Sequence, residues 1–263
     1  HPRAGVPPRW LLFAEEGGKA WAALIERFGW RGAYLALTVF VLVLGAAAAL
    51  SMKEKTVLRR GEALPGVGLR EALKRGEFWL LYLSLFFSCV GVFVPMVHLG
   101  PFAQDLGYSE AQGVALVSFI GLGSLLGRFT IGPFADRLGR RASLVAMYAG
   151  LGAMLLVWWG SSAYGALVFF AIAFGMFYGG CVALLPTIVM DLYGARAVSG
   201  IIGWLYTGAG LGTLLGPWLA GVAYDAYATY DAPILVSAVL SFLAAACVVL
   251  MATHEEKQKR HRR

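Results

Sequence analysis

Residues 127–141 read GRFTIGPFADRLGRR, and the change from apolar to charged residues within them is the clearest indication of the fold class. The first half continues an apolar segment that begins near residue 110, whereas the second half gathers charges around one glycine: Asp136, Arg137, Gly139, Arg140 and Arg141. A helix that reaches a bilayer surface needs a tight turn, which glycine permits, and the arginines of such a turn stay in water or contact anionic headgroups. The stretch therefore predicts a turn between two transmembrane helices.

The composition of the chain supports a membrane setting on both sides of this turn. Of 263 residues, 59% are hydrophobic and 14% are charged, and the mean hydropathy is +0.70. This exceeds what the core of a soluble domain needs, so the surplus must face lipid. Because backbone groups in lipid must be bonded within their own segment, helices are expected. The sequence predicts an all-α integral membrane protein with seven transmembrane helices, at residues 31–51, 78–99, 110–134, 143–160, 164–189, 197–222 and 231–252.

The positions of lysine and arginine give the predicted helices an orientation. Residues 52–77 hold seven of these cations, 135–142 hold three, 190–196 hold Arg196, and the segment after 252 holds five. The intervening connections, 100–109, 161–163 and 223–230, hold none. Basic connections stay on the cytoplasmic side, so the alternation predicts seven consecutive crossings with a cytoplasmic C-terminus. The expected location is a bacterial inner (plasma) membrane.

Several function classes are disfavoured by what the residues lack. The net charge of +7 lies in short connections rather than on a water-exposed domain, so no nucleic-acid partner is expected. Cys89, Cys181 and Cys247 lie in apolar segments without a CxxC spacing or a histidine cluster, which favours structural thiols over a metal site or cofactor. No intramembrane Ser/His pair or paired aspartates occur at catalytic spacing, so we do not expect an enzyme.

The charged turn also carries a family resemblance. Its Gly132-x-x-x-Asp136-Arg137-x-Gly139-Arg140-Arg141 pattern resembles the loop signature of the major facilitator superfamily. In that family the signature recurs after the second and the eighth helices. The resemblance implies that Asp136 faces the positive N-terminus of a neighbouring helix and that this contact breaks and reforms between transport states. The alternative is a solvated charged turn with no such role.

Alignment on this signature implies a domain organisation. The seven spans become helices 6 to 12 of a twelve-helix transporter, so helices 1 to 5 would be missing partners. Residues 1–30 are expected to be an irregular, truncated remnant, 31–51 helix 6, and 52–77 a cytoplasmic central linker with a short interfacial helix near Leu69 to Arg75. Residues 78–252 are expected to form the C-terminal six-helix bundle, and 253–263 a basic cytoplasmic tail.

Arg128 is the first candidate for a substrate contact. An arginine inside a transmembrane helix costs about 3 kcal/mol or more, so it should face a polar cavity. Ser124 lies one turn earlier on the same helical face, and Gly121 and Gly132 lie near that stripe. The planar guanidinium suits a carboxylate, which it can bind through two hydrogen bonds. The alternative is an arginine that extends to the cytoplasmic surface.

Residues 94–103, VPMVHLGPFA, resemble helix 7 of the monocarboxylate-transporter-like branch, which includes oxalate and formate antiporters. In that branch a helix 8 arginine binds the carboxylate, and Arg128 has the matching place. The resemblance adds His98 as a ligand for substrate or proton, since imidazole changes charge near neutral pH. The alternative is an interfacial histidine bonded to a backbone carbonyl. The prolines of this segment are expected to interrupt helical hydrogen bonds beside a cavity.

Residues in two later predicted helices bear on the expected class of substrate. Tyr178 is a weaker candidate for substrate contact, because an aromatic residue is frequent there in the branch, although packing alone also explains it. Gly208, Gly212 and Gly216 recur every four residues and predict a helix-packing face. Some oxalate-type relatives carry a lysine in helix 11, whereas residues 198–222 hold no Lys or Arg. A small monocarboxylate is therefore favoured over a dicarboxylate.

These observations predict secondary active transport of a small organic anion by alternating access, coupled to protons through His98. Multidrug export is the main rival within transport, and a membrane receptor that binds ligand without flux is the rival from another class. Because half of the cleft would be missing, we expect the isolated chain not to transport. Saturable uptake of a labelled monocarboxylate into liposomes, lost on Arg128→Ala, would contradict that expectation.

Overall fold

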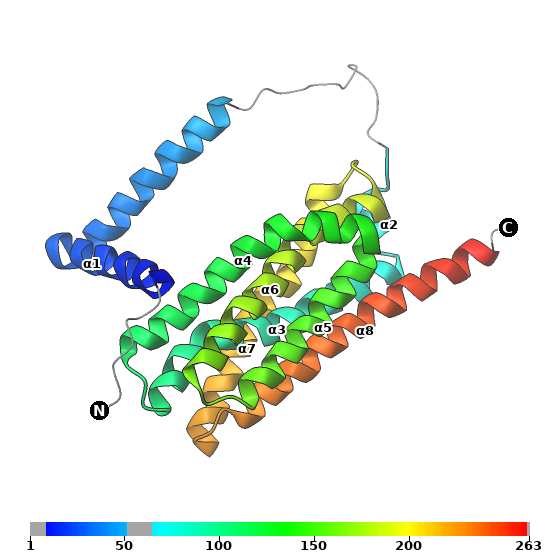
Figure 1. Cartoon of the computed structure of the whole chain (residues 1–263). Helices are drawn as coiled ribbons and strands as arrows, with labels where there is room; N and C mark the ends of the chain where they lie inside the picture. The colour runs from blue at the N-terminus through cyan, green and yellow to red at the C-terminus, as the bar shows by residue number, and fades with distance from the viewer. Residues whose placement is uncertain (1–8, 52–64, 262–263) are drawn as a thin grey trace. The chain divides into compact units, whose positions relative to one another are not determined.

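A computed structural model describes the backbone of residues 9–51 and 65–261, and the side chains of residues 26–51 and 65–253. The described chain is helical, with seven helices long and apolar enough to cross a membrane (Figure 1). This confirms the predicted all-α membrane fold. The chain divides into two compact units, His1–Glu62 and Ala63–Arg263.

The first unit contains α1 (Arg9–Ser51), which is interrupted at Gly29, where φ is 68°. The part of α1 around and after this break, Glu26–Ser51, is the first candidate span, and only 6% of its most apolar stretch is buried. Where the sequence predicted an irregular segment over 1–30, the backbone is helical from Arg9. A helix whose apolar surface is this exposed needs lipid or further helices to cover it.

The described residues of the second unit, 65–261, form a bundle of six long helices and one short one. Their bounds are α2 (Leu69–Ala72), α3 (Gly76–Asp105), α4 (Glu110–Leu138), α5 (Arg140–Trp159), α6 (Tyr164–Tyr193), α7 (Val198–Tyr227) and α8 (Asp231–His261). The short helix α2 confirms the turn of helix expected inside the linker. α3 continues through Pro95 and Pro101, so the prolines do not end it. α8 extends the last predicted span to His261, into the predicted tail.

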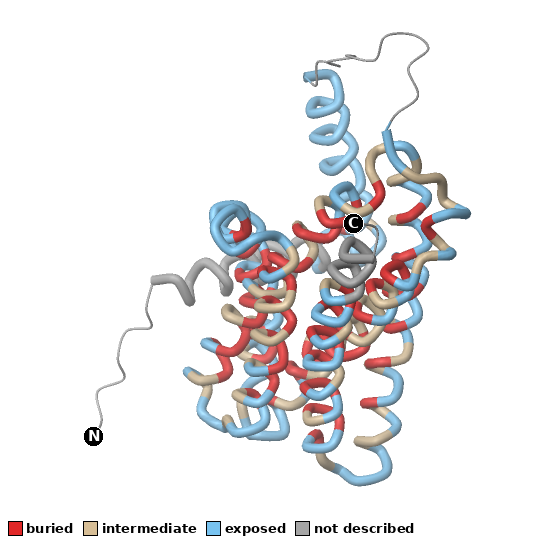
Figure 2. The backbone as a smooth tube through the Cα atoms, turned by 90° about the vertical axis from the view of Figure 1, so that its right-hand side faces the viewer, coloured by how far each residue is buried: buried red, intermediate tan, exposed pale blue. Residues whose placement is uncertain are grey.

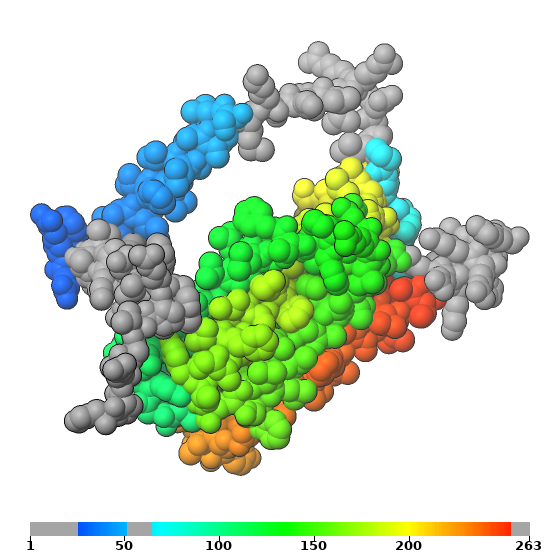
Figure 3. Space-filling model, in the orientation of Figure 1, coloured from blue at the N-terminus to red at the C-terminus, as the bar shows by residue number. Residues whose placement is uncertain are grey.

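The six long helices interlock as two sets of three. α3 packs mainly against α7 and α8, whereas α6 packs mainly against α4 and α5, and α5 also contacts α8. With α3, α4 and α5 as one set and α6, α7 and α8 as the other, the first helix of each set packs against the last two helices of the other. Figure 3 shows α4, α5 and α6 (greens) side by side on one face, with α8 (orange to red) along the edge. Buried positions line the inner sides of these helices (Figure 2).

Two close helix contacts hold this arrangement. The α4–α6 seam consists of Ile120, Gly123, Ser124 and Gly127 of α4 with Ile172, Gly175, Met176 and Gly179 of α6. The α3–α7 seam consists of Tyr82, Phe86 and Val90 of α3 with Gly208, Gly212 and Gly216 of α7. The packing role predicted for the α7 glycines is confirmed. Small residues at such contacts let two backbones approach closely in a membrane.

A backbone clasp closes one end of the bundle. Gly66 pairs with Gly194 in an isolated antiparallel bridge, flanked by two backbone hydrogen bonds of 2.9 Å between residues 65–67 and 193–195. Both glycines have positive φ, 134° and 74°, and a Cβ on either would overlap the other strand. The end of the linker is therefore fixed to the turn between α6 and α7.

Candidate functional site

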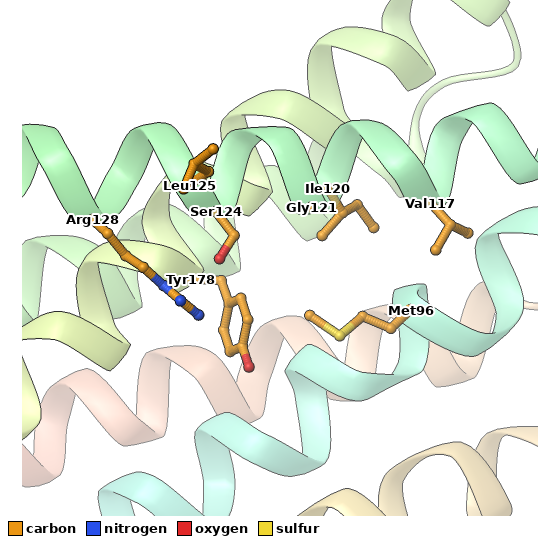
Figure 4. Close-up of a pocket in the computed structure, with 8 residues that line it drawn as sticks. All are labelled: Met96, Val117, Ile120, Gly121, Ser124, Leu125, Arg128 and Tyr178. Atoms are coloured by element: carbon orange, nitrogen blue, oxygen red, sulfur yellow. The ribbon is translucent and has the colours of Figure 1, made fainter. Parts of the chain in front are cut away.

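A cavity of about 430 Å³ opens beside α4, where three of the four predicted substrate residues meet. α4 lines it with residues spaced three or four apart, α3 contributes Met96, and α6 contributes Tyr178 (Figure 4). The α4 residues are Val117, Ile120, Gly121, Ser124, Leu125 and Arg128. Residues at this spacing share one face of a helix, so the stripe predicted from Ser124 and Arg128 does line a cavity.

The Arg128 guanidinium reaches across this cavity toward the ring of Tyr178 (Figure 4). The Ser124 hydroxyl points into the same recess from α4, toward Tyr178. Among the described residues that line the cavity, Arg128 carries the only formal charge. A cation with a hydroxyl and a phenol nearby, in an otherwise apolar recess, is chemically suited to a single anionic group.

The α4–α6 seam explains why these side chains converge. Gly127 and Gly179 face the partner helix so closely that a Cβ on either would overlap a backbone carbonyl across the seam. Their chain neighbours are Arg128 and Tyr178. Successive residues on a helix are about 100° apart, so a residue next to a seam glycine lies at the edge of the seam. Both side chains therefore lie at the edge of one contact and line one recess.

His98 lies elsewhere and does not line this cavity. Its Nε2 is 3.0 Å from the Pro217 carbonyl oxygen of α7, and its ring centroid is 5.5 Å from that of Tyr230. Met96, two residues earlier on α3, does line the cavity. Residues two apart on a helix point to nearly opposite sides, so His98 cannot share the recess with Met96. The placement matches the alternative of a histidine bonded to a backbone carbonyl.

A second cavity, of about 540 Å³, lies between α3, α5, α6 and α7. Tyr178 lines it as well, so one side chain borders both cavities. Its other residues include Cys89 and Phe93 of α3, the buried Tyr148 of α5 and Tyr206 of α7. No motif indicated this second cavity, because its walls come from four helices and no single segment of the sequence shows which helices are neighbours.

The charged turn predicted as a conformational switch joins α4 to α5. Gly139 lies between the two helices with φ of 86°, a conformation that favours glycine, whereas Gly132 lies inside α4. Asp136 and Arg137 are exposed. Arg140 forms an ion pair with Asp191 near the end of α6, so this turn is tied to α6 through a contact that the sequence did not predict.

Metal chemistry finds no support in the described residues. No group of three His, Cys, Asp or Glu side chains lies close enough there to hold an ion. The three cysteines are free thiols.

Taken together, the seven apolar helices define a polytopic helical membrane protein, and a cavity beside one intramembrane arginine is its candidate site. The family model described as Major Facilitator Superfamily matches residues 81–263, most of the chain. The chain therefore belongs to the major facilitator superfamily, as the charged turn predicted.

Three relatives show which members of the superfamily this chain is similar to. Monocarboxylate transporter 12 of Xenopus laevis is 29% identical over 243 residues, covering 81% of this chain and 53% of the relative. Monocarboxylate transporter 3 of Rattus norvegicus is 29% identical over 240 residues, covering 86% and 47%. The MFS-type transporter pytF of Aspergillus terreus is 31% identical over 147 residues, covering 53% and 49%.

Two consequences follow from these relatives. The chain spans about half the length of each of them. All three come from eukaryotes, so they lend no support to the bacterial membrane that the sequence suggested.

Proposed function

We propose that this chain forms the substrate-binding C-terminal part of a secondary transporter for small monocarboxylates. The observation that carries the proposal is the recess in which Arg128, as the only formal charge among the described lining residues, points toward Tyr178 with Ser124 alongside. The guanidinium would bind the carboxylate through two hydrogen bonds, and the two hydroxyl groups would add one each. The similarity to monocarboxylate transporters supports the same substrate class.

Transport itself would be a property of the whole protein. In this superfamily a bound substrate lies between two helical bundles that rock about a midplane site. We propose that helices equivalent to the first five of a twelve-helix transporter cover the recess beside α4. The charged turn around Asp136, with its Arg140–Asp191 pair, would then change partners as the bundles move.

The orientation with the basic connections and the C-terminus in the cytoplasm remains part of this proposal. A single cysteine placed in the 161–163 connection of a cysteine-free chain should react with an impermeant maleimide added outside intact cells, and one placed in the 135–142 turn should not. The reverse pattern would invert the orientation.

Binding to the purified chain in lipid nanodiscs tests the proposal directly, by calorimetric titration with lactate. Arg128→Ala should weaken lactate about 10- to 100-fold, because charge-assisted hydrogen bonds contribute roughly 1.5–3 kcal/mol. Arg128→Lys keeps the charge but loses the bidentate geometry, so its lactate affinity should lie between those of the wild type and Arg128→Ala. Arg196→Ala, which removes an exposed arginine from the turn after α6, is the matched control and should change nothing.

Two results would overturn the carboxylate assignment. One is lactate binding that is equal in the wild type and in Arg128→Ala. The other is displacement by a lipophilic cationic dye but not by pyruvate, which would favour the multidrug alternative.

We propose that His98 acts in proton coupling from outside the recess. Its imidazole bonds α7 through the Pro217 carbonyl, so a change in its charge would alter the contact between α3 and α7. The measurement is proton uptake on lactate binding, followed with a pH-sensitive dye. His98→Gln should abolish the uptake while lactate affinity at fixed pH is kept, and unchanged uptake would remove His98 from the mechanism.

A further inference from the structure

The second cavity and the Arg128 recess are neighbours that share one wall. Tyr178 lines both, and the two volumes are about 430 and 540 Å³. Cavities of roughly 300–1,000 Å³ hold ligands of drug size. A three-carbon acid bound at Arg128 would leave the second cavity unused.

The lining of the second cavity is suited to an apolar group. Its described residues are aliphatic or aromatic side chains, two thiols, three phenols, two small hydroxyls and a glycine, and none of them carries a carboxylate, ammonium or guanidinium. The buried Tyr148 comes from α5, and Leu214 lines the cavity from α7. No lining residue offers an opposite formal charge to a desolvated ion, whereas a phenyl or branched aliphatic group would bury apolar surface there.

Tyr178 lies at the boundary between the two cavities, where one ligand could pass from the first into the second. Its side chain is half-buried, and Phe93 contacts it edge-on with ring centroids 6.4 Å apart. Tyr178 lines the first cavity together with Arg128, and it lines the second cavity together with Cys89 and Tyr206. A carboxylate at Arg128 would therefore have its own carbon chain directed along the Tyr178 ring toward the second cavity.

We infer that the substrates are carboxylates with an apolar body, such as an aryl or branched-alkyl group, which lies beyond Tyr178 in the second cavity. This inference rests on the proposed function, since it takes Arg128 as the carboxylate ligand. It goes beyond it by assigning the second cavity as the site that sets specificity for the rest of the molecule.

Two glycines allow each cavity to be filled separately. Gly210 lines the second cavity and Gly121 lines the Arg128 recess, and a Cβ on either would meet nothing within 4 Å. A leucine at either position would extend into open space. Gly203, two turns before Gly210 on nearly the same face of α7, also has nothing within 4 Å and lines neither cavity, so Gly203→Leu is the matched control.

The test is calorimetric titration of the full chain in nanodiscs with lactate, 3-phenylpropionate and 3-phenylpropanol. In the wild type we expect 3-phenylpropionate to bind at least about tenfold tighter than lactate, since each apolar group placed in a fitting pocket contributes about tenfold or more. Gly210→Leu should abolish that advantage and leave lactate unchanged, which also shows that the variant is folded. Gly121→Leu should weaken the binding of both acids, and Gly203→Leu should weaken the binding of neither.

The outcomes separate the inference from the function beneath it. If lactate binding depends on Arg128 but 3-phenylpropionate is no tighter, or Gly210→Leu leaves its affinity unchanged, the inference is overturned and the proposed function stands. If 3-phenylpropanol binds as tightly as the acid, the second cavity is not joined to Arg128 and the inference is overturned. If neither acid depends on Arg128, the proposed function fails, and the inference fails with it.

Discussion

The α4–α6 and α3–α7 seams join corresponding helix pairs of the two interlocked sets, yet they are built differently. In the α4–α6 seam, glycines on both helices face backbone across the contact: Gly123 and Gly127 on α4, Gly175 and Gly179 on α6. In the α3–α7 seam the glycines lie on α7 alone. There, a Cβ on Gly216 would overlap backbone, one on Gly212 would lie 2.6 Å from the Phe86 carbonyl oxygen, and one on Gly208 would meet only the Tyr82 ring, at 2.9 Å.

This difference in packing explains where the two cavities lie. The α4–α6 seam keeps its backbones in contact over more than a full turn, which gives Arg128 and Tyr178 a rigid base. The α3–α7 seam loosens along α7 from Gly216 back to Gly208, and the second cavity lies against this stretch of α7, from Tyr206 to Leu214. Close packing holds the proposed carboxylate site, and looser packing leaves room for the rest of a ligand.

The largest effect is expected at the rigid seam, for Gly179→Ala. Its Cβ would overlap the Ser124 carbonyl oxygen, and neither backbone can move without separating the helices. Overpacking of this kind costs roughly 1–3 kcal/mol, and we expect about 3 kcal/mol because the obstacle is backbone. The free energy of unfolding in mixed SDS micelles, followed by tryptophan fluorescence, measures the loss. Lactate affinity should fall as well, because Tyr178 is the adjacent residue.

The neighbouring glycine supplies the control for that variant. A Cβ on Gly180 would lie 2.8 Å from the sulfur of Met147, whose flexible side chain can move aside. Gly180→Ala should therefore cost less than about 1 kcal/mol by the same measurement. Equal losses at the two positions would show that the α4–α6 seam is not the rigid base described above.

Much of this fold could be predicted because its signals are local. Hydropathy and the alternation of basic connections gave the seven spans, and the four-residue repeat in α7 gave one side of a seam. The glycines of α6 have the same spacing, but a single sequence does not say that their partners are Gly123 and Gly127 of α4. Which helices become neighbours is decided by packing over the whole bundle, and no periodic pattern in the sequence shows it.

The candidate site likewise contains residues that a local pattern predicted and contacts that no local pattern predicted. Ser124 and Arg128 were predictable together, since both lie on one stripe of one helix. His98 was expected with them through a resemblance, but α3 turns Met96 toward the recess, which directs His98 to the Pro217 carbonyl. The second cavity and the Arg140–Asp191 pair require contacts between distant segments, so no motif indicated them.

An intermediate effect is expected at the loose seam, for Gly208→Ala. The added methyl group would meet the half-buried Tyr82 ring, whose hydroxyl lies 3.4 Å from the Thr207 hydroxyl oxygen. A side chain can yield where a backbone cannot, so we expect a loss of about 1 kcal/mol in the same unfolding assay. In a Tyr82→Leu background the loss should shrink toward zero. A loss as large as that of Gly179→Ala would mean that the two seams are equally rigid.

The smallest effect, and of opposite sign, is expected for Gly203→Ala on the exposed side of α7. A Cβ there would meet nothing within 4 Å, so the methyl group adds no strain. Glycine within a helix is less favourable than alanine by roughly 0.5–1 kcal/mol, chiefly through the freedom it loses on folding. Gly203→Ala should therefore raise the free energy of unfolding by up to about 0.5 kcal/mol, because a membrane-embedded unfolded helix has already lost part of that freedom. A loss above about 1 kcal/mol would show that Gly203 makes a close contact, and Gly203 could then no longer serve as the uncrowded reference position on α7.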